Sequence, residues 1–143
     1  GMIGGQVTDV RETGHKLSRE KLDFIYALKT GALIESSMMI GAVLAGASEE
    51  EIKQAEKIAA KTGFAFQVQD DILDVTSTSE TLGKPVHSDE KNEKTTYVTL
   101  MGIEEAGRAV EELSEEAISL LHQLPEENHF LEQLLCQLIH RDR

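Results

Sequence analysis

The chain has 143 residues, of which 40% are hydrophobic and 28% charged, with two prolines and few aromatic residues, a composition that predicts one all-α domain over residues 1–143. The net charge of −12 argues against a nucleic-acid partner, because phosphate contacts need a basic face. Cys136 is the only cysteine, and the sequence has neither a basic leader nor a long apolar window, so we expect a cytoplasmic protein without a membrane span.

Apolar spacing and polar punctuation predict about five helices. The first covers roughly residues 2–13 and begins without an N-cap, and the second follows Ser18 and continues to about residue 45. The third starts at Ser48, where Glu51 completes a capping box, and ends near Val75.

A polar segment of about twenty residues, 76–94, follows the third helix, and segments of this length in a compact domain are usually functional. Two further helices are predicted beyond it. One covers about residues 96–122 with a break at Gly102, and the other covers about residues 126–141 after Pro125.

Four polar residues fall on one stripe of the third helix: Gln67, Asp70, Asp71 and Asp74, at i, i+3, i+4 and i+7. Apolar residues border the stripe on both sides, so we expect it to line a cleft. Like charges at this spacing cost roughly 0.2–0.5 kcal/mol per pair, and anions near a helix C-terminus cost roughly 0.3–1 kcal/mol each, so a cation must compensate. Convergent carboxylates suit Mg²⁺ that bridges to phosphates, and the alternative is a solvated acidic patch.

Basic residues near the aspartates are the expected partners of an anionic ligand. Lys84 lies in the middle of the polar segment and Lys94 near its end, so both can fold over the end of the third helix. Lys29 and Thr30 lie in a mostly apolar helix, where a charged side chain either reaches out to solvent or points at an anion. Spacing alone leaves both interpretations open.

The segments GMIGGQVTD, KTGALIE, GFAFQVQDDILD and LGKPVHSDEKNEKTTYVTL occur in this order. Together with the last two helices they resemble the second half of a bacterial trans-isoprenyl diphosphate synthase of the farnesyl or geranylgeranyl type, over essentially the whole chain. The resemblance implies part of the all-α isoprenoid-synthase fold, an antiparallel bundle around a deep cavity. It also implies a prenyltransferase that condenses isopentenyl diphosphate with an allylic diphosphate.

The resemblance further implies roles for individual residues. Asp70, Asp71 and Asp74 resemble the second aspartate-rich motif, which holds Mg²⁺ bridged to the allylic diphosphate. The residues that resemble diphosphate-binding positions are Lys29, Thr30, Gln67, Lys84 and Lys94. Of these, Lys29, Thr30 and Lys84 are expected to act in catalysis by helping the diphosphate leave.

The first aspartate-rich motif of such enzymes does not occur in the 143 residues. We therefore expect the chain to be inactive in condensation by itself. The alternative is a non-catalytic helical subunit or interaction module that pairs with another chain. Apolar faces carrying Ile34, Met38, Phe66 and Leu73 would need a cover, which predicts a homo-oligomer.

Overall fold

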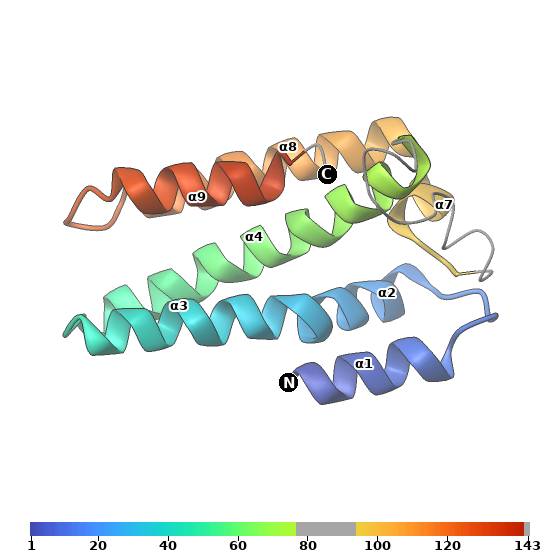
Figure 1. Ribbon diagram of the computed structural model, residues 1–143, viewed down its shortest axis with the longest axis horizontal. Coiled ribbons are helices and arrows are strands. Elements are labelled where there is room, and N and C mark those ends of the chain that lie inside the picture. Colours follow the sequence, from blue (N-terminus) through green and yellow to red (C-terminus); the bar gives the residue numbers. More distant parts are fainter. Residues whose placement is uncertain (77–93, 142–143) are drawn as a thin grey trace.

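The structure is a computed structural model that describes residues 1–76 and 94–141, and these residues form helices and turns without a strand. The helices are α1 (Met2–Arg11), α2 (Arg19–Tyr26), the π-helical η1 (Ala27–Gly31), α3 (Ala32–Leu44), α4 (Glu49–Thr76), α7 (Tyr97–Met101), α8 (Ile103–Leu121) and α9 (His129–Ile139). The segments α2, η1 and α3 follow one another without a break and form one long helical run (Figure 1). Each of the predicted helical regions is therefore present, and the all-α prediction is confirmed.

The helix ends follow the local signals in the sequence. The side chain of Ser18 caps α2, and Ser48 and Glu51 exchange hydrogen bonds at the start of α4. Gly102 has a φ of 85°, a left-handed conformation that favours glycine, and it separates α7 from α8 as predicted. Asn128 caps α9 through its side chain, so this last helix begins at residue 129, slightly later than predicted.

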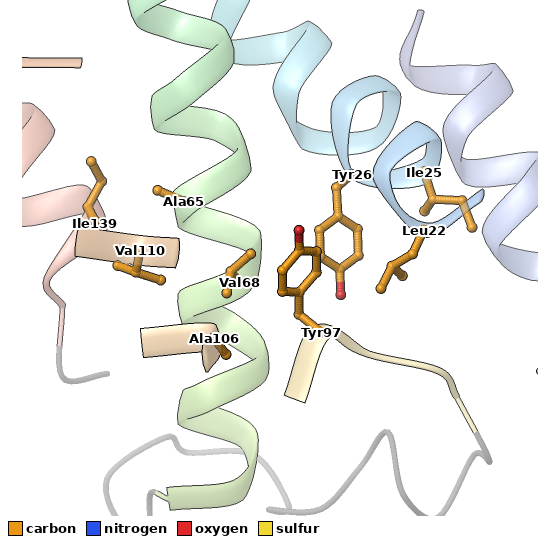
Figure 2. Close-up of a cluster of buried hydrophobic side chains, with 9 residues drawn as sticks. All are labelled: Leu22, Ile25, Tyr26, Ala65, Val68, Tyr97, Ala106, Val110 and Ile139. Atoms are coloured by element: carbon orange, nitrogen blue, oxygen red, sulfur yellow. The ribbon is translucent and has the colours of Figure 1, made fainter. Parts of the chain in front are cut away.

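The long helix α4 is the centre of the bundle. Its 28 residues span about 42 Å at the usual rise per residue, and it packs on α3 on one side and on α8 on the other. Small residues on α4 make these contacts close. In Figure 2, Val68 of α4 lies between Tyr26 and Tyr97 on one side and Val110 on the other. The core thus continues across both faces of α4.

Glycines allow two helices to pack directly on the backbone of η1. A Cβ atom at Gly5 of α1 would lie 2.5 Å from the backbone nitrogen of Lys29, and one at Gly63 of α4 would lie 2.8 Å from the Cα of Gly31. Side chains larger than hydrogen do not fit at such distances. The segment that carries Lys29 and Thr30 is therefore packed closely between α1 and α4.

The helical run Arg19–Leu44 has the length and composition that could cross a membrane, and it is the one such run in the described part of the chain. The expectation that no window reaches this composition is therefore wrong. A single run of this kind is weak evidence for a membrane span, because apolar helices of bundles pass the same test. The absence of a span stays a prediction.

Candidate functional site

The middle aspartate of the acidic stripe, Asp71 of α4, is buried where α4 meets α2 and α7, a place called the Asp71 junction below. Its Oδ2 atom accepts a hydrogen bond from the hydroxyl of Tyr26 in α2 and another, at 2.8 Å, from the backbone N–H of Tyr97 in α7. The rings of Phe64, Tyr26 and Tyr97 pack against one another around it, with centroids 5.6–6.1 Å apart. Asp71 is 8% exposed, so this carboxylate faces inward, and the expectation that the stripe lines a cleft stays a prediction.

Its neighbour Asp70 faces a different environment. The Nη2 atom of Arg141, just after α9, donates a hydrogen bond of 2.9 Å to Asp70 Oδ1, and the guanidinium lies 3.7 Å from the centroid of the Phe66 ring. The Asp70 side chain remains 44% exposed, whereas that of Arg141 is 17% exposed. Arg141 thus supplies a positive charge beside Asp70, and sequence analysis missed it because residues 70 and 141 are far apart in the chain.

The third aspartate, Asp74, lies on the last turns of α4 and is 3% exposed. In residues 1–76 and 94–141, no three His, Cys, Asp or Glu side chains are grouped closely enough to hold a metal ion. The three aspartates therefore do not form a carboxylate cage among themselves. Their assignment to Mg²⁺ stays a prediction.

Two of the predicted diphosphate-binding lysines meet at one carboxylate. Lys29 Nζ lies 2.7 Å and Lys94 Nζ 3.4 Å from Oδ2 of Asp9 in α1. Burial favours the neutral acid, but hydrogen bonds and charge from Lys29 and Lys94 outweigh it and lower the pKa of Asp9. Residues 29 and 94 are far apart in sequence, so this cluster exists through the fold.

The segments that carry these two lysines are both held by hydrogen bonds to the buried Asp71. Lys29 follows Tyr26 by about one helical turn, and the Tyr26 hydroxyl is bonded to Asp71. Lys94 precedes Tyr97 by three residues, a span of at most about 11 Å between Cα atoms, and Tyr97 N–H is bonded to the same carboxylate. The backbone segments on either side of the lysine pair are therefore anchored to α4 at the same carboxylate.

The chain shows similarity to known proteins over almost its whole length. The polyprenyl synthetase family profile matches residues 1–136. The chain belongs to the polyprenyl synthetase family. It is 46% identical over 118 residues to the chloroplastic geranylgeranyl pyrophosphate synthase of Capsicum annuum, in an alignment that covers 82% of this chain and 32% of that protein. A dimethylallyltranstransferase of Fischerella ambigua is 43% identical over 118 residues, covering 82% of this chain and 34% of that protein.

Solved structures support the same membership. A geranyltransferase of Helicobacter pylori, solved with magnesium and isoprenyl diphosphate, is 36% identical with a TM-score of 0.81, covering 97% of this chain and 46% of that one. The heptaprenyl diphosphate synthase of Staphylococcus aureus has a TM-score of 0.93 at 22% identity, covering 99% and 57%, which shows the shared fold alone. This polyprenyl synthetase chain spans about a third of the length of the curated relatives first matched.

Three predicted site residues remain: Thr30 and Gln67, which the structure describes, and Lys84, which it does not. Thr30 follows Lys29 in η1 and Gln67 lies on α4, and both are half-buried. Lys84 lies outside the described residues. The π-helical turn that carries Lys29 and Thr30 was not predicted, although π-bulges inside α-helices are frequent at functional sites.

A second group of charges beside Tyr97 was also missed from the sequence. The Nη2 atom of Arg19 donates a hydrogen bond of 2.9 Å to the Tyr97 hydroxyl, and its Nε atom lies 3.8 Å from Asp23 Oδ2. Burial raises the pKa of Asp23 in spite of the attraction of Arg19. Burial, followed by the charge of Asp23, raises the pKa of Tyr97. These residues flank the junction on the side of α2.

Proposed function

We propose that this polyprenyl synthetase chain supplies the allylic-diphosphate site of a prenyltransferase that condenses isopentenyl diphosphate with an allylic diphosphate. The observation that carries the proposal is the meeting of Lys29 and Lys94 at Asp9, on segments whose tyrosines, Tyr26 and Tyr97, both bond to Asp71 of α4. A diphosphate carries several negative charges, and two ammonium groups held together match it. The chain as a whole has a net charge of −12, so a place where two lysines meet at one carboxylate stands out from its mostly acidic charge.

The aspartates fit Mg²⁺ if the metal also binds the diphosphate. Mg²⁺ in such sites takes one or two carboxylates and completes its octahedron with water and phosphate oxygens, so it needs no cage of protein ligands. Asp70 and Asp74 are the proposed main contacts, in keeping with their resemblance to the second aspartate-rich motif. When bound, Mg²⁺ would supply positive charge to the departing diphosphate.

The residues of the chain itself would hold and release the diphosphate. Lys29, Thr30 and Gln67 hold it, together with Lys84 and Lys94. The leaving diphosphate gains negative charge in the transition state, so lysines placed beforehand stabilise the transition state more than the bound substrate. Apolar walls keep water from the allylic cation.

Calorimetry with inorganic diphosphate tests this proposal. We expect binding that requires Mg²⁺, with Asp70→Ala weakening it at least about tenfold because a carboxylate ligand is lost. Glu104→Ala, at an exposed position on α8, is the matched control and should leave the affinity unchanged. Binding without Mg²⁺ dependence, or equal losses in both variants, would instead favour the solvated acidic patch.

We further propose that the 143 residues alone do not complete the condensation. The residues that would hold isopentenyl diphosphate are not among those identified in this chain. The test is an assay with isopentenyl and geranyl diphosphate, in which sustained turnover by the purified chain would contradict the proposal.

A non-catalytic subunit is the second candidate function. One matched relative, 42% identical over 120 residues, is the large subunit 1 of a heterodimeric geranylgeranyl pyrophosphate synthase of Arabidopsis thaliana. Loss of Mg²⁺-dependent diphosphate binding, together with retained binding to a second synthase chain, would favour this alternative.

Exposed apolar side chains support the proposal of a homo-oligomer. Of the four predicted residues, Leu73 is buried and Phe66 lies beneath Arg141, whereas Ile34 and Met38 on α3 are partly exposed. More exposed residues include Ile3 on α1 and Ile40 on α3, at 75% and 59% exposed. Light scattering should give a mass of at least two chains, and a monomer that binds no hydrophobic dye would rule the oligomer out.

A further inference from the structure

We propose that Asp9 is a positioning residue for the diphosphate site: its carboxylate holds the ammonium groups of Lys29 and Lys94 side by side, ready for the ligand. The inference rests on the proposed function for what the lysines bind. Its own basis is the pair of contacts that Asp9 Oδ2 makes, at 2.7 Å to Lys29 and 3.4 Å to Lys94.

The packing of α1 explains how Asp9 reaches both lysines. Gly5 lies one turn before Asp9 on the same face of α1, and its missing side chain lets α1 approach the backbone of Lys29. The Asp9 side chain is consequently 15% exposed, well inside the contact between α1 and η1. Lys94 enters from the segment before α7, which is tied to the turn after α1 because Thr95 Oγ1 accepts the N–H of Leu17 at 3.0 Å.

The cluster has the charge and the spare hydrogen-bond donors that a diphosphate needs. One carboxylate between two ammonium groups reduces their repulsion and still leaves a net positive charge. Each ammonium group has three N–H donors, so a bond to Asp9 leaves the others for phosphate oxygens. Asp9 and the diphosphate can therefore hold the same lysines at the same time. Without Asp9, two flexible side chains that repel each other must be ordered when the ligand binds, which weakens binding.

Asp9 also remains charged at neutral pH. Charge and hydrogen bonds from its lysine partners outweigh burial and lower the pKa of Asp9, so the carboxylate is ionised at neutral pH. The neutral variant Asp9→Asn keeps the shape of the side chain and removes this charge.

The matched control is Glu12, which caps the C-terminal end of α1. Glu12 also pairs with a lysine of the following helix, Lys21, but takes no part in the cluster around Lys29. Glu12→Gln therefore removes an ion pair from the end of the same helix without touching the proposed site.

The experiment measures the affinity for inorganic diphosphate in the presence of Mg²⁺ by calorimetry. We expect Asp9→Asn to weaken binding about tenfold, and Glu12→Gln to change it less than about twofold. In a Lys94→Gln background the effect of Asp9→Asn should shrink, because one of the two lysines that Asp9 positions is gone. A purely structural role for Asp9 would give the same effect in both backgrounds.

A second readout uses the free protein. Asp9→Asn should raise the rate at which an amine-acylating reagent modifies Lys29 and Lys94, measured by mass spectrometry, while Lys21 stays unchanged. If Asp9→Asn does not fold, Asp9→Glu serves instead, because its longer side chain shifts the charge and should weaken binding in part. Unchanged or tighter diphosphate binding in a folded Asp9 variant overturns the inference. Absence of binding in the unmodified chain refutes the proposed function, and the acylation rates then decide whether Asp9 positions the two lysines.

Discussion

Asp70 and Asp71 are adjacent in the chain and have opposite surroundings. Asp71 is enclosed by α2, α4 and α7 and accepts hydrogen bonds from Tyr26 and Tyr97. Asp70 is partly open to solvent and pairs with Arg141. Successive residues of a helix point about 100° apart, so one carboxylate joins the core while the next reaches the surface. The contrast teaches that neighbouring members of one acidic motif divide between holding the fold and pairing at the surface.

Gly4 and Gly5 repeat this contrast on α1. A Cβ atom at Gly5 would collide with the backbone of η1, whereas one at Gly4 meets no atom within 4 Å in the described part of the chain. Of these two neighbouring glycines, Gly5 faces another helix and Gly4 does not, just as Asp71 is enclosed and Asp70 is not. The substitutions below test these differences.

The largest effect is expected from Asp71→Ala. Loss of the Asp71 carboxylate removes the acceptor of the hydrogen bonds from the buried Tyr26 hydroxyl and the Tyr97 N–H. We expect the free energy of unfolding to fall by about 3 kcal/mol. Urea denaturation measures this change in the free energy of unfolding. The same substitution at Asp70 should cost less than about 1 kcal/mol, because that pair is partly solvated. Similar losses at both positions would remove the distinction between them.

The next effect concerns the two glycines. Gly5→Ala and Gly4→Ala both gain helix propensity, up to about 1 kcal/mol, but the Cβ at position 5 also forces α1 away from η1. We expect the two variants to differ by about 2 kcal/mol in unfolding free energy, with Gly4→Ala the more stable. Equal stabilities would show that α1 does not pack as closely as the structure indicates.

Arg141→Gln tests the partly exposed face of α4 that carries Asp70 and Phe66. It removes the ion pair with Asp70 and the contact with the Phe66 ring, and we expect a loss of about 1 kcal/mol in unfolding free energy. Arg108→Gln is the matched control, since Arg108 pairs with Glu105 on the exposed surface of α8. A chemical denaturation curve for each variant gives the comparison, and an equal shift in both would mean that Arg141 adds nothing beyond a surface pair.

The pH dependence of stability should report the charge on Asp9. Its folded pKa is lowered from 3.8, so its ion pairs stabilise the fold above that pH and cease to do so as the pH falls through the folded value. The stability difference between the unmodified chain and Asp9→Asn should be below about 1 kcal/mol near neutral pH and vanish in acid. A difference that grows on acidification would have the wrong sign.

The smallest effect is expected at Asp23, where the sign is reversed. Burial raises its folded pKa above 3.8, so the ionised side chain weakens the fold as the pH rises through that value. Asp23→Asn should therefore stabilise the chain slightly at pH 7, by less than about 1 kcal/mol, and not at pH 3. Thermal unfolding at the two pH values is the measurement, and destabilisation at pH 7 would contradict it.

Much of the fold could be predicted because its signals are local. Ser18, Ser48 and Glu51 mark helix starts through hydrogen bonds to residues within one turn, and Gly102 marks a break through its own backbone angle. Likewise, the order of short motifs along the chain was enough to indicate the polyprenyl synthetase family, which the family profile confirms over residues 1–136. The sequence by itself therefore determined the helices, the fold class and the family.

The arrangement of the candidate site was decided by the tertiary structure. The spacing of Asp70 and Asp71 places both on one stripe, but it cannot tell which of them will meet Tyr97 and which will meet Arg141. Asp9 likewise gathers Lys29 and Lys94 across three separate segments. No periodicity relates residues so distant in the chain, because their contacts depend on how close the helices approach and at what rotation each helix packs.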